Sequence, residues 1–138
     1  MKAKDLMISD YISVKPSEMP IKVAAVHHKK VAYHAVVNKL EWVRESLLKP
    51  IPLTPEILEK NGFVANKHIY PYPYYEYEVK EDKLKVEFAF PQGNKTSYKE
   101  PWVYIDSERV FIEHLPCMFV HELQHLFRLC GITYEIII

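Results

Sequence analysis

Apolar and polar residues alternate in several short segments near the start of the chain, the pattern of half-buried β-strands. Residues 21–26 and 31–37 alternate on either side of the polar residues 27–30, which predicts a β-hairpin. Residues 10–15 and 40–44 are predicted as further short strands. Several short strands within about fifty residues favour a small barrel of the SH3-like kind.

The clearest local signals surround a predicted two-turn helix within residues 50–63. Thr54 suits the N-cap, and Pro55 suits the first helical position, where an N–H group is not needed. Gly62 can adopt the left-handed conformation that often follows a helix. The segment therefore connects the first strands to the remainder of the chain.

Alternation returns more clearly in residues 75–79 and 84–90, which predict a second hairpin, and short strands are expected at 102–105 and 110–112. An amphipathic helix is predicted over residues 116–130, ended by Gly131. The predicted fold class is a β-rich α+β protein. Its expected parts are an SH3-like barrel lobe at 1–50, a connector with a short helix at 51–66, and an antiparallel β lobe at 67–138 that includes the C-terminal helix.

The distribution of charge adds to this prediction, because the chain is neutral overall but its two parts carry opposite net charges. The chain has 18 Lys+Arg and 18 Asp+Glu, and 49% of its residues are hydrophobic, which indicates a globular protein. Residues 1–50 contain nine basic and five acidic groups, a net charge of +4, whereas residues 51–138 contain nine and thirteen, a net charge of −4. The first lobe could therefore bind an acidic surface.

A basic cluster near the first hairpin turn supplies the candidate binding residues. It could contact an acidic protein surface or phosphate, and the alternative is a solvated turn. Trp42 is expected in the core or between lobes. The candidate binding residues are Lys22, His27, His28, Lys29, Lys30 and Arg44.

His121-Glu122-Leu123-Gln124-His125 matches the His-Glu-x-x-His signature of zinc hydrolases. Histidines at i and i+4 share one helix face, and the glutamate between them can activate a metal-bound water. Helical phase places both histidines away from the apolar stripe, so we expect this face to be solvated.

A zinc site would also need a third protein ligand. Glu135 is the only carboxylate downstream of the motif, and His114 and Cys117 are the upstream candidates. The leading expectation is therefore no catalytic residue, no metal and no cofactor. Zinc bound by His121 and His125, with Glu122 as catalytic base, remains the alternative.

Residues 49–63 and 119–127, with Gly131, resemble corresponding segments of small uncharacterised proteins from gut Bacteroidetes and their phages. The likeness also covers the opening phrase, residues 6–12, and the layout of strands and hairpins. Members of that group often have Gln at the position of Glu122 and Asn at the position of His125. The group has no assigned activity. The resemblance therefore implies a similar fold and no particular chemistry.

The sequence favours a non-enzymatic accessory or adaptor protein, with a protein partner or, as an alternative, nucleic acid. A zinc-dependent hydrolase is the rival function. The apolar stretch at residues 6–8 is too short for a signal peptide, and no run approaches the roughly 20 apolar residues of a membrane span. We therefore expect a cytoplasmic protein without a membrane partner, with Cys117 and Cys130 reduced.

Overall fold

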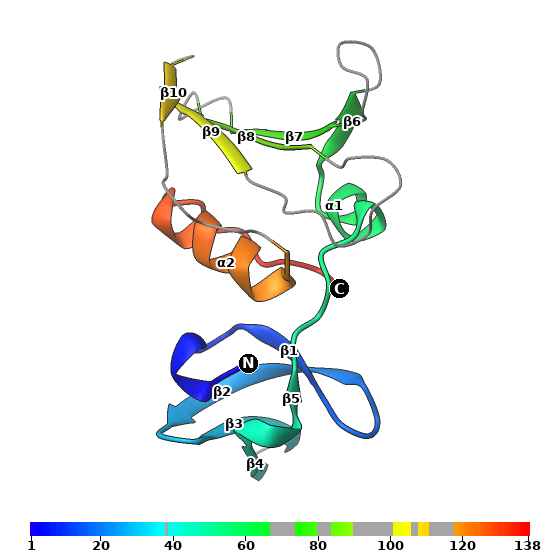
Figure 1. The fold of residues 1–138 in the computed structure, drawn as a ribbon, viewed down its shortest axis with the longest axis vertical. Coiled ribbons are helices and arrows are strands. Elements are labelled where there is room, and N and C mark those ends of the chain that lie inside the picture. Colours follow the sequence, from blue (N-terminus) through cyan, green and yellow to red (C-terminus); the bar gives the residue numbers. More distant parts are fainter. Residues whose placement is uncertain (38, 67–73, 80–83, 90–100, 106–107, 111–117) are drawn as a thin grey trace. The chain divides into compact units, whose positions relative to one another are not determined.

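Two antiparallel five-stranded sheets and two α-helices make up the described fold, as predicted for a β-rich α+β protein (Figure 1). The computed structural model describes residues 1–37, 39–66, 74–79, 84–89, 101–105, 108–110 and 118–138. The chain divides into an N-terminal unit, Met1–Pro52 with Phe119–Thr133, and a C-terminal unit, Leu53–Met118 with Tyr134–Ile138.

The sheet of the N-terminal unit has the strand order β4-β3-β2-β1-β5. The strands predicted from alternation are confirmed, whereas the short fifth strand and the 3₁₀ helices had no clear pattern in the sequence. The elements are η1 (Ala3–Asp5), β1 (Tyr11–Val14), β2 (Met19–His27), β3 (Lys30–Val36), β4 (Lys39–Arg44), η2 (Glu45–Leu47) and β5 (Leu48–Lys49).

The predicted small barrel is wrong in one respect, because the described strands do not close. Strand β4 pairs with β3, and β5 pairs with β1 through only two residues, so β4 and β5 are the two edges of the sheet. Ile12, Val23 and Val31 cover one face of the sheet, which we call the inner face. Ala3 and Leu6 of the N-terminal segment join this core, so the segment covers the inner face without a further strand.

Helix α2 (Val120–Leu129) belongs to the N-terminal unit, whereas the sequence predicts it as part of the lobe at 67–138. The Val120 N–H donates to the Ile51 carbonyl at 2.9 Å, and Pro52 forms an isolated β-bridge with Phe119. The predicted start at residue 116 lies outside the described residues. In the described part of the chain, no helix is long and apolar enough to cross a membrane.

Helix α1 (Pro55–Lys60) of the C-terminal unit follows its sequence signals closely. The Thr54 hydroxyl accepts the Ile57 N–H at 3.4 Å, and Pro55 takes the first helical position. Gly62 has a φ of +82°, in the left-handed region where a side chain would be strained. The predicted two-turn helix is therefore confirmed.

The second sheet has the order β10-β9-β8-β7-β6, with every neighbouring pair antiparallel. It contains the predicted second hairpin. Its strands are β6 (Val64–Asn66), β7 (Tyr74–Val79), β8 (Leu84–Ala89), β9 (Pro101–Ile105) and β10 (Glu108–Val110).

Asn61, which is fully buried, attaches the C-terminal residues of the chain to α1. Its Oδ1 accepts the Ile137 N–H at 2.6 Å, and its Nδ2 donates to the carbonyls of Ile137 and Ile57, each at 2.7 Å. One side chain thus serves both backbone groups of Ile137. The buried Ile136 lies beside this attachment in the sequence.

Candidate functional site

Much of the polar face of α2, expected to be solvated, is covered, although Arg128 at its C-terminal end stays exposed. The exposed fractions of His121 and Gln124 are 6% and 8%. The expectation was wrong because the face is covered by residues 7–11, which precede and begin β1 and lie more than a hundred positions away along the chain. The contacts that cover it centre on Asp10.

Asp10 is fully buried, and its carboxylate is held by three donors. The Met7 N–H donates to Oδ2 at 2.7 Å, and His125 Nε2 lies 2.8 Å from the same oxygen. Arg128 Nη1 donates to Oδ1 at 2.8 Å. A buried carboxylate needs such partners to offset its lost hydration. His125 and Arg128 therefore fasten α2 to the chain before β1.

Gln124 adds a second attachment on the same helix face. Its Oε1 accepts the Tyr11 N–H at 2.8 Å, and its Nε2 donates to the Ser9 carbonyl at 2.9 Å. Ser9 has a φ of +73°, uncommon for a residue with a side chain, and its N–H donates to the Val23 carbonyl at 2.7 Å. Gln124 thus satisfies one backbone donor and one backbone acceptor of this segment.

Glu122, the candidate catalytic base, lies at the N-terminus of α2. Its Oε2 accepts the Phe119 N–H at 3.0 Å, which satisfies a backbone donor at the helix start. A carboxylate there also interacts favourably with the helix dipole. This position explains the glutamate through helix capping.

His121 differs from its motif partner, because its Nδ1 is buried and has no hydrogen-bond partner among the described residues. Its ring stacks on Phe119 with centroids 5.9 Å apart and planes 10° apart, and lies edge-on to His125. Burial lowers the pKa of His121 to about 4, and the nearby Asp10 carboxylate opposes this effect. His121 is therefore neutral at pH 7.

In the part of the chain that the structure describes, no third metal ligand accompanies His121 and His125. No group of three or more His, Cys, Asp or Glu there is arranged to hold a metal ion. The upstream candidates His114 and Cys117 lie outside the described residues. The observed contacts give His125 and Glu122 structural roles in docking and capping α2.

Three of the predicted basic residues form one row across the N-terminal sheet. Lys30 of β3 lies opposite His27 of β2 and opposite Arg44 of β4. Directly opposed residues in antiparallel strands project to the same face. His27, Lys30 and Arg44 are all exposed, so the row is accessible in this unit.

The other three candidates do not join this row. Lys22 lies opposite Tyr11 of β1, with its Nζ 5.8 Å from the centre of the Tyr11 ring. His28 and Lys29 form the turn between β2 and β3, where His28 has a φ of +47°. The predicted cluster therefore separates into a row, a turn and a distant lysine.

Trp42 lies beside the row and is 51% exposed, so of its two expected places, in the core or between lobes, the core is wrong. Val26, Val31 and Val43 pack against the core, which places the alternate residues of β2–β4 on the opposite face. The ring centroids of His27 and Trp42 are 6.3 Å apart, with the planes at 82°. We call this surface the outer face; it consists of Ala25, His27, Lys30, Ala32, His34, Leu40, Trp42 and Arg44.

Strand parity places Trp42 correctly once the inner face of the sheet is known. Val43 belongs to the inner face, so its neighbour on the strand must project to the other side. Opposite Trp42 lies Ala32, whose small, fully buried side chain leaves space above it for the indole.

No protein-family model, curated protein or solved structure matches the chain.

Proposed function

We propose that the protein is a non-enzymatic adaptor that binds an acidic segment of a partner protein on the outer face of β2–β4. The observation that carries this proposal is the half-exposed Trp42 beside the row of His27, Lys30 and Arg44. An aromatic anchor next to cations suits a peptide with both acidic and apolar residues.

The order of the strands supports a finer description of this unit. Strand β2 pairs with β1 through residues 19–22 and with β3 through residues 23–27, with a bulge at Val23/Ala25. A 3₁₀ helix then separates β4 from β5. We propose that this sheet is an open variant of the SH3-like arrangement, a small β scaffold well suited to binding peptides.

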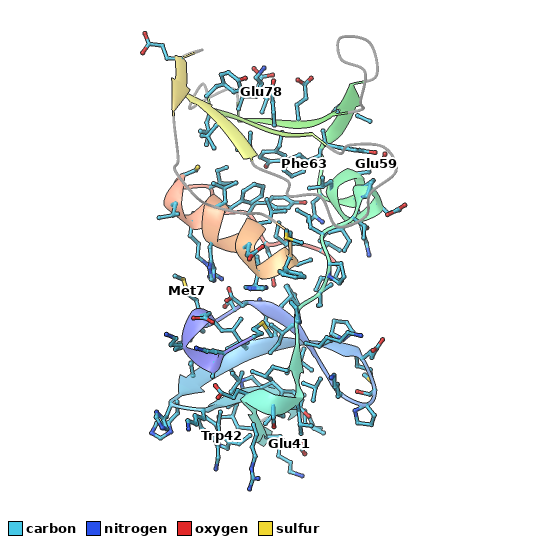
Figure 2. The ribbon with its side chains drawn as sticks, viewed as in Figure 1. Met7, Glu41, Trp42, Glu59, Phe63 and Glu78 are labelled. Atoms are coloured by element: carbon cyan, nitrogen blue, oxygen red, sulfur yellow. The ribbon has the colours of Figure 1, made fainter. Side chains whose placement is uncertain are left out.

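Apolar groups on the outer face supply the contact area. Leu40 is 47% exposed and lies two residues from Trp42, on the same face of β4. Trp and Arg are enriched among the residues that dominate the free energy of protein binding. Leu40, Trp42 and Arg44 thus form a stripe of alternate residues along β4. Figure 2 shows Trp42, next to the label of Glu41, at the β4 end of this unit.

Charge selects an acidic partner. The outer face has two permanent cations and two histidines and no carboxylate. The acidic side chains of Glu41 and Glu45 are engaged with other groups, Glu41 with Tyr33 and Lys39 and Glu45 with the Ala3 N–H. An incoming carboxylate on the outer face therefore meets the cations of that face and no carboxylate that belongs to it.

Nucleic acid is the less favoured partner for this surface. Strong binding to a phosphate backbone comes from many neutralised phosphates, and the row provides only Lys30 and Arg44 as permanent charges. A half-exposed Trp and Leu also favour a peptide with apolar side chains. Single-stranded DNA is therefore the comparison ligand in the test.

The test is a titration of the chain into a fluorescently labelled probe peptide. The probe is short, capped and alternates Glu, Glu, Tyr and Val with threonines. We expect saturable binding with a dissociation constant on the order of 1–100 μM, typical of transient contacts. Trp42→Ala should weaken it at least about tenfold, whereas Met19→Ala, at another exposed apolar residue of the sheet, should not.

A single-stranded oligonucleotide of similar length provides the competing arm of the experiment. Binding of the DNA at physiological salt without binding of the probe peptide would overturn the proposal in favour of a nucleic-acid surface. Equal loss of peptide binding in Trp42→Ala and Met19→Ala would also overturn it, because the outer face would then not be the specific site.

A further inference from the structure

We propose that the partner segment binds as an added antiparallel strand along the free edge of β4. This inference rests on the proposed function, because it specifies how the acidic segment lies on the outer face. It adds main-chain hydrogen bonds to the side-chain contacts and fixes the register of the partner.

Strand β4 is an edge of its sheet. In the order β4-β3-β2-β1-β5, its only neighbour among the described strands is β3. An edge strand presents unpaired N–H and C=O groups, to which an extended peptide can bind. Figure 1 shows β4 at the end of this sheet.

The hydrogen-bonding register of β3 and β4 identifies which N–H and C=O groups of β4 point away from β3. The Glu45 N–H donates to the Lys29 carbonyl at 2.9 Å, just beyond the paired residues Lys30 and Arg44. Hydrogen-bonded pairs alternate with non-hydrogen-bonded pairs in antiparallel strands. The pairs Val31–Val43 and Tyr33–Glu41 are therefore the hydrogen-bonded ones.

It follows that Leu40, Trp42 and Arg44 direct their N–H and C=O groups away from β3. Their partners on β3 are His34, Ala32 and Lys30, in the non-hydrogen-bonded pairs. The same three residues of β4 carry the side chains of the outer face. The same alternate residues of β4 thus offer main-chain groups to a partner strand and side chains to its residues.

This coincidence specifies the chemistry of the partner. An antiparallel strand would pass Arg44 first, then Trp42, then Leu40, with its own alternate side chains on the same face. Charge and apolar matching at those positions predict an acidic residue, then an aromatic or large apolar residue, then an aliphatic residue. The segment is therefore extended, with acidic residues on its N-terminal side.

A second copy of the chain fits this edge less well. Two β4 strands pairing antiparallel about Trp42 would place Arg44 opposite Leu40. The cations of the row would then face no carboxylate of the outer face. Charge complementarity therefore favours a foreign acidic segment over self-association.

The experiment uses the probe peptide in two N-methylated forms with the full chain. One form carries N-methyl groups on its Glu, Tyr and Val residues, whose amides would face β4, and the other carries them on the threonines. We expect the first set to weaken binding at least about tenfold, because the N–H donors to the edge are removed. The threonine set should change binding less than about twofold.

The outcomes separate the two proposals. Binding of the unmodified probe that is equally sensitive to both sets of N-methyl groups would overturn strand addition and leave the adaptor proposal standing. Failure of the unmodified probe to bind would overturn both. A chain that forms dimers in sedimentation and excludes the probe would assign the edge to a second copy, which also contradicts the inference.

Discussion

His125 Nε2 lies 2.8 Å from Asp10 Oδ2, although the two residues are 115 positions apart in the chain. The contact joins the last helix to the segment before the first strand, and Arg128 binds the other oxygen of the same carboxylate. His125, the last residue of the His-Glu-x-x-His motif, thus helps to dock the helix. Four of the predictions below concern such contacts, and a fifth tests the binding face.

Asp10→Asn should strongly destabilise the N-terminal unit. The substitution removes the buried charge that holds Arg128 and His125, and losing one member of a buried charged network is costly. Because Arg128 is partly exposed, we expect a loss of about 2–4 kcal/mol in the free energy of unfolding, measured by urea denaturation. Glu18→Ala, which breaks the exposed ion pair with Lys49, is the control and should change stability little. Equal effects of the two variants would contradict the docking role.

His121 should make stability depend on pH. Its folded pKa of about 4 lies below the ordinary value of 6.5, so the unfolded state binds more protons between these values and stability falls as pH decreases below 6.5. Between pH 7 and pH 4.5 this group alone should cost about 2 kcal/mol. His121→Leu should lose that component, as measured by chemical denaturation at both pH values. An unchanged pH dependence in the variant would show that the buried histidine is not responsible.

Glu122→Gln should have a small effect on folding. The amide oxygen can still accept the Phe119 N–H, and only the favourable interaction of the charge with the helix dipole is lost. We expect a decrease of less than about 1 kcal/mol in the free energy of unfolding, measured under the same conditions as Asp10→Asn. A loss as large as that of Asp10→Asn would mean that helix capping is not the main role of this carboxylate.

Asn61→Ala should release the C-terminal residues from α1. The variant loses three part-buried hydrogen bonds, two of them to Ile137, and the free energy of unfolding of the C-terminal unit should decrease by about 2 kcal/mol. Hydrogen exchange at the Ile137 amide should accelerate most. Lys60→Ala is the matched control, because Lys60 contacts the carbonyl of Ile138 from an exposed position. Unchanged protection of Ile137 in Asn61→Ala would count against this role.

Local signals accounted for the elements that the sequence predicted well. Helix α1 is specified by Thr54 before it and Gly62 after it, and the β7–β8 hairpin by strict alternation. These signals act between residues that are close in the chain. The elements that they specify therefore form in the same places regardless of the tertiary packing.

Docking of α2 could not be predicted, because it depends on pairing between distant residues. Helical phase separates His121 and His125 from the apolar stripe, but it cannot identify what covers the polar face. The covering residue, Asp10, lies before β1 and has no pattern that links it to the helix. Its burial could be inferred only from the folded structure.

The binding face was found in part. Lys30 and Arg44 were chosen for their charge, and the register places them side by side with His27. Trp42 is expected in the core or between lobes, and its 51% exposure excludes the core of this unit. The alternation of β4 about Val43 contained the correct answer, but the inner face could be identified only after the core was known.

Charge reversal at Arg44 tests the proposed binding face most directly. Arg44→Glu should weaken binding of the acidic probe peptide at least about tenfold. It should strengthen binding of the same peptide with lysines in place of its glutamates. Lys15→Glu, an equal charge change in the turn after β1, should leave the preference for the acidic probe unchanged. The measurement is fluorescence anisotropy of both peptides with the wild type and both variants. Retention of the acidic preference in Arg44→Glu, or its equal loss in Lys15→Glu, would contradict the assignment of the outer face.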